Sequence, residues 1–262
     1  MVRDVREYML DEIFNAIKCN FDVSEYAFKG GYVLKSILGG GVRRTTDIDL
    51  SVGRVEYFDR VIEIIEPLAR KWVSDGLIYS YKINKPKKCS TGNIKFYRKH
   101  SENTRAFVYC GIDVDLHPIN YGILRLDDGS NVYSIERMLS EKFWTMYTLN
   151  EKVLLHRVKD ALDIYLVCEY HRQNKLEIND SLVVEYVKEL MKINGYSNLR
   201  CMSMLEMVTI KDVGSVLARL EEEKMTRISD GMRMYVDNSG VITCSLNYVN
   251  YIRGLVNAAL LE

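Results

Sequence analysis

The 262-residue sequence is poor in proline, in histidine and in cysteine motifs that bind metal. It has three prolines, four histidines and six cysteines, and the cysteines are dispersed without a Cys-x-x-Cys motif. This usage disfavours a zinc site and favours reduced thiols in a cytoplasmic protein. The sequence shows no internal repeat and no Pro-rich or Ser-rich linker.

The sequence also lacks long apolar runs and a net charge. No apolar run approaches the roughly 20 residues needed to span a bilayer. The charged N-terminal segment MVRDVREYML is unlike a secretion signal. We therefore expect a cytoplasmic protein without a membrane partner. The 36 basic and 36 acidic residues cancel, which excludes a strongly basic nucleic-acid-binding protein but allows a local basic patch.

Such a patch lies between residues 82 and 105, a stretch rich in lysine and arginine with one acid, Glu102. Its cations are interleaved with Phe96 and Tyr97, a composition that suits an RNA backbone and unstacked bases. A solvated hairpin whose charges prevent edge-strand aggregation would have the same composition, and the two interpretations have equal weight. The candidate RNA-binding residues are Lys87, Lys88, Lys95, Arg98 and Lys99.

The most informative stretch is FKGGYVLKSILGGGVRRTTDIDLSV, residues 28–52. In an expected strand, Asp47 and Asp49 lie on one face while Ile48 and Leu50 enter the core. Two carboxylates on one face repel each other unless a cation lies between them. A hard divalent cation such as Mg²⁺ binds carboxylates together with substrate phosphates. By itself, an Asp-x-Asp pair is more often a solvated face or a turn.

A pair of glycines, Gly30 and Gly31, precedes an apolar run with helical spacing. Backbone N–H groups at such a helix start can bind an anion, although Gly-Gly alone is usually a turn. The order of glycines, helix and Asp-x-Asp strand is typical of a site for phosphate and metal.

The pattern KGGxxL…RxTxDIDL resembles the nucleotidyltransferase superfamily, and within it the AbiE-type (AbiEii-like) toxins of type IV toxin–antitoxin systems. Members transfer a nucleoside monophosphate from an NTP, in several cases to the 3′ end of tRNA, and block translation until an antitoxin intervenes. The resemblance implies an NTP substrate, Mg²⁺ or Mn²⁺, a tRNA or other RNA acceptor and a cognate antitoxin. It implies nucleotide binding by Lys29, Gly30, Gly31, Arg44 and Thr46.

The family has a third acid on a later strand, and the segment GIDVDL supplies Asp113 and Asp115. We rank Asp113 above Asp115 because Asp113 directly follows the apolar lead-in of that strand. The alternative for Asp115 is a strand-end residue without a metal. The candidate metal ligands are therefore Asp47, Asp49, Asp113 and Asp115.

Two later segments resemble the remaining family motifs, a lysine on one helix and Lys-Asp-x-x-Asp-x-Tyr on the next. They contribute Lys142, Lys159, Asp160 and Asp163. The resemblance implies catalytic roles for Lys142 and Asp160, and nucleotide binding by Lys142, Lys159 and Asp163. The alternative is an ordinary salt-bridged helix surface.

The expected chemistry is transfer by a two-metal mechanism. Asp47 and Asp49 would bind the metal on the nucleotide side. Asp47, Asp49 and Asp113 together would bind the second metal, which activates the acceptor. Lys142 would contact triphosphate oxygens, where a compact charge offsets developing negative charge.

Hydrophobic periodicity predicts an α/β (α+β) protein with strands in its first half and mostly helices after residue 135. The resemblance implies a mixed-sheet nucleotidyltransferase core at 1–125 and a helical domain at 126–262 that completes the active site. The expected helices are Val5–Lys18, Tyr32–Leu38, Tyr57–Asp75, Ile135–Leu149, Leu154–Glu169, Ser181–Ile193, Met202–Met207, Ile210–Glu223 and Leu246–Leu261. The expected extended segments are Tyr26–Lys29, Asp47–Val52, Ile78–Ile83, Ile94–Tyr97 and Ala106–His117, and the expected turns are 127–130 and 237–240.

Two other functions fit the motifs. One is a nucleotidyltransferase that modifies a small molecule such as an antibiotic, which the basic stretch at 82–105 disfavours. The other is a non-catalytic nucleotide-binding regulator, which the complete set of motif acids disfavours.

Overall fold

The computed structural model describes residues 4–22, 24–38, 45–86, 91–117, 121–147, 154–195, 218–222 and 238–261. The chain divides into two compact units. The first consists of Met1–Val33 and Thr45–Tyr133, and the second of Leu34–Arg44 and Ser134–Glu262. The expected domains at 1–125 and 126–262 stay a prediction.

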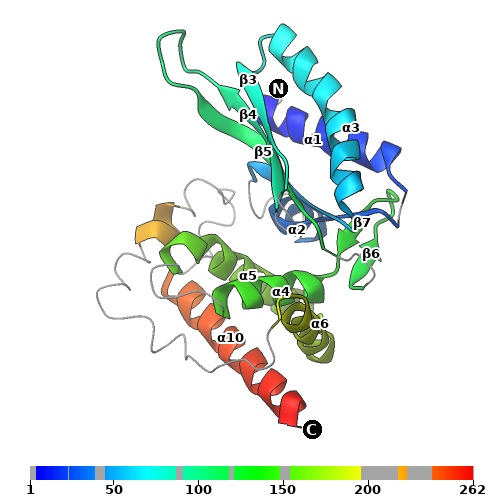
Figure 1. The fold of residues 1–262 in the computed structure, drawn as a ribbon. Helices are drawn as coiled ribbons and strands as arrows, with labels where there is room; N and C mark the ends of the chain where they lie inside the picture. The colour runs from blue at the N-terminus through cyan, green and yellow to red at the C-terminus, as the bar shows by residue number, and fades with distance from the viewer. Residues whose placement is uncertain are drawn as a thin grey trace. The chain divides into compact units, whose positions relative to one another are not determined.

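The first unit contains a seven-stranded mixed sheet with strand order β3-β4-β5-β2-β1-β7-β6 (Figure 1). Strand β2 pairs parallel with β5 and antiparallel with β1. The mixed α/β class is thereby confirmed. The strands are β1 (Tyr26–Lys29), β2 (Asp47–Val52), β3 (Ser80–Asn84), β4 (Gly92–Arg98), β5 (Phe107–Asp115), β6 (Ile123–Arg125) and β7 (Asn131–Tyr133).

The strands β6 and β7 were not expected from the sequence. They flank the expected turn at 127–130, where Gly129 has a φ of +84° and Asp128 accepts hydrogen bonds from Ser130. Each strand has only three residues, too few for an alternating pattern to be recognised. Pairing of β7 with β1 adds this hairpin to the sheet.

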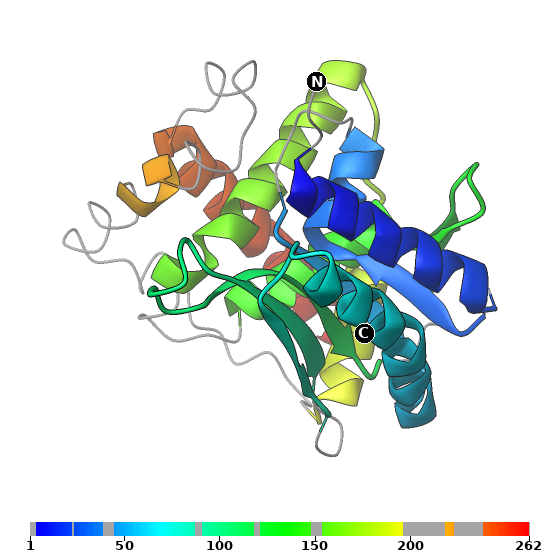
Figure 2. The same ribbon diagram turned by 90° about the horizontal axis from the view of Figure 1, so that it is seen from above.

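Two helices, α1 (Val5–Asn20) and α3 (Val55–Ser74), lie side by side against the sheet of the first unit (Figures 1 and 2). Phe14 of α1 stacks on Phe28 of β1, and Trp72 of α3 meets Phe96 of β4 edge-on. Because strand side chains alternate, the apolar residues of β2, such as Ile48, are buried here. Asp47 and Asp49 therefore belong to the opposite face.

The second unit is helical, with α4 (Ile135–Tyr147), α5 (Leu154–Asn174), α6 (Asp180–Ile193) and α10 (Asn238–Leu261) packed together (Figure 1). Their buried residues include Phe143, Leu162, Val187 and Ile252. Asn179 caps α6 by accepting a hydrogen bond from the backbone N–H of Leu182 at 3.2 Å. None of the described helices is long and apolar enough to cross a bilayer.

The expected turn at 237–240 is wrong for residues 238–240, which form the first turn of α10. The polar residues Asn238 and Ser239 favour a helix start as much as a turn, and the apolar residues that follow continue the helix. The predicted helix Met202–Met207 lies outside the described residues. Of the predicted helix Ile210–Glu223, only 218–222 are described, and these are helical.

The helix α2 (Gly30–Leu38) follows β1 directly and begins two residues before its predicted start. Its glycines thus belong to the first turn of the helix. Since its N-terminal residues through Val33 belong to the first unit, the backbone N–H groups of this turn are fixed next to β1.

Candidate active site

Three aspartates are brought together by the pairing of β2 with β5. Asp49 lies directly opposite Asp113, and Asp47 lies opposite Gly111. Adjacent strands are about 4.8 Å apart, so carboxylates more than sixty positions apart in the sequence become neighbours on one face. We call the face that carries Asp47, Asp49 and Asp113 the acidic face.

The acidic face contains its own cation, Lys95 of β4. Its Nζ lies 3.3 Å from Oδ1 of Asp47 and 2.9 Å from Oδ1 of Asp113. Burial lowers the pKa of Lys95, but hydrogen bonding and charge from Asp113 and Asp47 outweigh it, so the net shift is upward. The sequence had placed Lys95 among RNA-binding residues, because it did not show that this side chain of β4 turns toward the acids.

Glycine at position 111 makes room for this contact. A Cβ there would lie 2.7 Å from Cδ of Lys95 and 3.0 Å from Oδ1 of Asp47. Such distances would force the lysine or the carboxylate to move. Gly111 was not among the predicted site residues, and in the sequence it appears only as a glycine within an apolar strand, a signal of close approach by a neighbour.

The fourth acid, Asp115, is engaged differently from Asp113. Its Oδ2 lies 2.6 Å from Nζ of Lys29, and its Oδ1 accepts a hydrogen bond from Oγ1 of Thr91 at 2.6 Å. Burial raises the pKa of Asp115, but the Lys29 charge and the two hydrogen bonds outweigh it and lower the pKa overall. Both carboxylate oxygens of Asp115 therefore have protein partners.

The glycine at position 30 lies against Asp49. Gly30 has a φ of +68°, in the left-handed region that favours glycine. A Cβ on this residue would lie 1.9 Å from Oδ2 of Asp49. The backbone at the start of α2 therefore lies directly against the Asp49 carboxylate, without room for a side chain.

Replacing Gly30 with alanine is expected to impair both stability and activity. The left-handed φ alone costs an alanine about 1–2 kcal/mol, and the added Cβ must displace the Asp49 carboxylate. Gly53→Ala is the matched control, since a Cβ there meets nothing within 4 Å. The melting temperature and the rate of nucleotidyl transfer should both be lower than wild type for Gly30→Ala. Both should stay near wild type for Gly53→Ala. Equal behaviour of the two variants would contradict a positioning role for Gly30.

The threonines before β2 orient Asp47. Oγ1 of Thr46 donates a hydrogen bond to Oδ2 of Asp47 at 2.8 Å, and Oγ1 of Thr45 donates to the backbone carbonyl of Asp47 at 2.9 Å. Thr46 was predicted to bind nucleotide, and its observed contact is with a candidate metal ligand. Arg44, another predicted nucleotide-binding residue, lies outside the described residues.

The acidic face fits a divalent cation by its chemistry. In the described ranges, no three His, Cys, Asp or Glu side chains form a group that could hold a metal ion. However, the candidate ligands Asp47 and Asp113 already share one cation, the Lys95 ammonium, which stands where a metal ion would bind. An all-carboxylate donor set suits Mg²⁺ or Mn²⁺.

The motif residues of the second unit form a separate buried cluster. Nζ of Lys142 on α4 lies 3.0 Å from Oδ1 of Asp160 and 2.6 Å from Oδ2 of Asp163, both on α5. The exposed fractions of the three side chains are 11%, 9% and 1%. These three residues are therefore not an ordinary salt-bridged helix surface, which was the alternative interpretation of the motif. Lys159 is partly exposed on α5. Binding of a nucleotide by these residues stays a prediction.

The residues of the predicted RNA-binding stretch do not share one location. Lys95 lies at the acidic face, whereas the guanidinium of Arg98 lies 4.6 Å from the ring centroid of Tyr109, and Nζ of Lys99 lies 3.7 Å from that of Tyr79. Tyr79 is 56% exposed. Lys87 and Lys88 lie outside the described residues.

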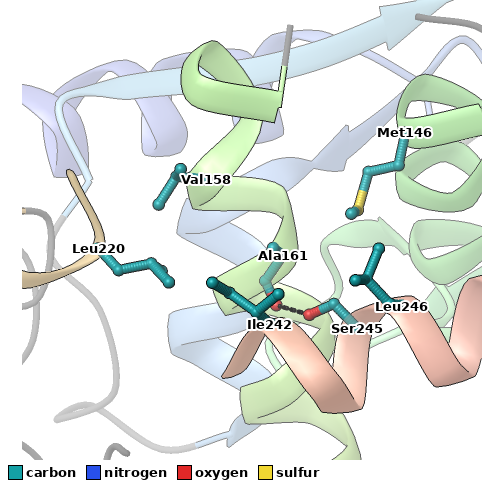
Figure 3. Close-up of a pocket in the computed structure, with 7 residues that line it drawn as sticks. All are labelled: Met146, Val158, Ala161, Leu220, Ile242, Ser245 and Leu246. Carbon is teal, nitrogen blue, oxygen red and sulfur yellow. Dashed lines mark hydrogen bonds between the residues drawn. The ribbon is translucent and has the colours of Figure 1, made fainter. Parts of the chain in front are cut away.

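A small pocket in the second unit does not resemble an active site. Figure 3 shows the side chains that line it, all uncharged, from α4, α5, residues 218–222 and α10. The dashed line is the hydrogen bond that Oγ of Ser245 donates to the carbonyl of Ala161 at 2.7 Å. This bond joins α10 to α5, and the surrounding contacts are apolar packing.

Comparisons with solved structures agree with this fold. The chain resembles a crystal structure of a putative nucleotidyltransferase from Helicobacter pylori, with a TM-score of 0.51, 13% identity and coverage of 98% of this chain and 96% of that one. JHP933 from Helicobacter pylori gives the same score and identity, with 98% and 97% covered. MenT4, the nucleotidyltransferase toxin Rv2826c of Mycobacterium tuberculosis H37Rv, has a TM-score of 0.50 and 13% identity, with 96% and 92% covered.

At 13% sequence identity, these three structures establish the fold of the chain and not its function. A search of curated proteins finds no match. The model of the family described as "Nucleotidyl transferase AbiEii toxin, Type IV TA system" matches residues 13–237. A match over most of the chain confirms the resemblance of the KGGxxL and RxTxDIDL motifs. The protein therefore belongs to the AbiEii nucleotidyl transferase toxin family of type IV toxin–antitoxin systems.

Proposed function

We propose that this toxin-family nucleotidyltransferase moves a nucleoside monophosphate from an NTP to an RNA acceptor, namely the 3′ end of tRNA, with Mg²⁺ or Mn²⁺ as cofactor. The observation that carries the proposal is the register of β2 with β5, which sets Asp49 opposite Asp113 beside the first turn of α2. Carboxylates and helix N–H groups at one place provide for a metal and for phosphate oxygens.

Asp47, Asp49 and Asp113 would hold the metal. When bound, the metal neutralises charge on the triphosphate and makes the acceptor hydroxyl a better nucleophile. We assign the third ligand to Asp113 and not Asp115, because the strand register sets Asp113 opposite Asp49, whereas Asp115 lies opposite Ser51 and contacts Lys29 and Thr91. Thr46 holds the Asp47 carboxylate in place through its hydrogen bond.

Phosphate oxygens would be received by the backbone N–H groups at Gly30 and Gly31. The positive end of the helix dipole of α2 favours negative charge at this position. Lys29, which precedes them, is held next to the same turn by its ion pair with Asp115. Lys142 is not included among these phosphate-binding groups, because its ammonium already pairs with the carboxylates of Asp160 and Asp163.

RNA is the proposed acceptor because cations and aromatic rings occur together on β4 and its surroundings. Arg98 with Tyr109 and Lys99 with the exposed Tyr79 provide charge for phosphates and rings for bases. Membership of a type IV toxin–antitoxin family makes a cognate antitoxin the second expected macromolecular partner.

The proposal predicts that the purified protein labels RNA. Incubation with each α-³²P-labelled NTP in turn, Mg²⁺ and total RNA should place label in a band of tRNA size for at least one NTP. Chelation by EDTA should abolish the label because the carboxylates require the cation, and added Mg²⁺ or Mn²⁺ should restore it. Label that appears only on an added small molecule would indicate an antibiotic-type transferase. Absence of any product with every NTP would contradict catalytic transfer to RNA.

A further inference from the structure

The contact between Lys95 and the acidic face has a consequence for metal binding. The Lys95 ammonium bridges Asp47 and Asp113, which are two of the three acids proposed as metal ligands. The side chains of this cluster are all partly buried, with exposed fractions of 20% for Lys95, 30% for Asp47 and 34% for Asp113. A divalent ion and this ammonium therefore require the same carboxylate oxygens.

We propose that Lys95 is an internal counter-ion that occupies the cation position of the acidic face in the metal-free protein and competes with the divalent metal for Asp47 and Asp113. This inference rests on the proposed function, because it assumes that these carboxylates bind metal. Lys95 thereby sets the metal affinity of the site and stabilises the acids before metal arrives.

Three features of the structure favour exchange of the two cations. The Lys95 ammonium is a compact charge on a flexible four-carbon stem, and its Cδ passes over Gly111, which has no side chain to hold it in place. The Asp47 carboxylate keeps its hydrogen bond from Thr46 whichever cation is bound. The exposed fractions of the cluster show that solvent reaches it, so the displaced ammonium can become hydrated.

The chain offers a matched control on the neighbouring strand. Lys82 of β3 lies directly opposite Lys95 of β4 in the antiparallel pairing, and it is exposed. Lys82→Met removes the same charge one strand farther from β5, which carries Asp113. Comparison with Lys95→Met therefore separates direct competition from a general change in electrostatic potential.

The test measures binding of Mn²⁺ alone, by the electron paramagnetic resonance of free Mn²⁺ and by titration calorimetry. Lys95→Met should bind Mn²⁺ roughly tenfold more tightly than wild type, since two partly buried ion pairs no longer have to be broken. The metal-free variant should melt at a lower temperature than wild type, and saturating Mn²⁺ should raise its melting temperature by more than it raises that of wild type. Lys82→Met should bind Mn²⁺ within about twofold of wild type, as expected for a screened charge without a direct contact.

Lys95→Gln is the second variant and keeps a polar side chain, should Lys95→Met fold poorly. Equal or weaker Mn²⁺ affinity in the folded Lys95 variants, with clear binding by wild type, would overturn the competition but leave the proposed function in place. Equal tightening in Lys82→Met and Lys95→Met would also overturn it. Absence of Mn²⁺ binding in wild type and in all variants would overturn both the competition and the metal-dependent mechanism.

Discussion

Asp49→Asn is expected to reduce nucleotidyl transfer by at least about a thousandfold while the protein keeps its fold. The asparagine retains the shape of the side chain but removes the negative charge opposite Asp113. Metal coordination supplies several kcal/mol of transition-state stabilisation, and about 4 kcal/mol corresponds to a thousandfold in rate. Because Asp49 belongs to a set of like charges, loss of its charge should leave the melting temperature within a few degrees of wild type.

The measurement pairs a transfer assay with thermal unfolding for the same protein sample. Asp59→Asn is the control, because Asp59 is 56% exposed in a surface ion pair with Lys85, 2.7 Å away, and such pairs contribute little. This control should retain transfer activity. Wild-type activity of Asp49→Asn, or its inactivity with a collapsed melting temperature, would argue against a catalytic role for Asp49.

Lys142→Met is expected to destabilise the protein by roughly 3–5 kcal/mol, the cost of leaving buried charges without their partner. The carboxylates of Asp160 and Asp163 are almost fully buried and share the Lys142 ammonium. For a unit of this size the loss corresponds to a decrease in melting temperature on the order of 10 °C. Lys192→Met on α6 is the control, because Lys192 is 70% exposed in an ion pair with Glu189. It should change the melting temperature by little.

A double variant separates the structural role of Lys142 from the predicted role at the triphosphate. Lys142→Met combined with Asp163→Asn removes one of the two buried charges that lose Lys142 as a partner, and it should recover part of the stability. If Lys142 contacts the triphosphate, transfer should stay about a hundredfold below wild type at a temperature where the double variant is folded. Recovery of activity together with stability would instead make Lys142 a structural residue that joins α4 to α5.

Local patterns in the sequence predicted Asp47 and Asp49 of the acidic face, whereas Asp113 was expected from the family resemblance. The alternation in Asp47-Ile48-Asp49-Leu50 predicted the strand β2 with the observed bounds, since a side-chain period of two separates a buried face from a polar one. The glycine pair that begins α2 was also recognised, because glycines at the start of a helical apolar pattern indicate backbone N–H groups that can bind an anion. Local periodicity likewise predicted the long helices, although their ends shifted and the short hairpin of β6 and β7 was missed.

Contacts between site residues that are distant in the sequence were determined by the tertiary structure. The sequence ranked Asp113 above Asp115 only because Asp113 directly follows the apolar lead-in of the strand. Strand register, with Asp113 opposite Asp49, and the contact of Lys29 with Asp115 distinguish the two in the structure. Lys95 belonged by composition to a basic stretch, and only the placement of β4 beside β5 turned it toward Asp47 and Asp113. A sequence encodes which side chains share a face, because alternation is local. The side chains that meet across strands depend on register, which is determined by the packing of the whole sheet.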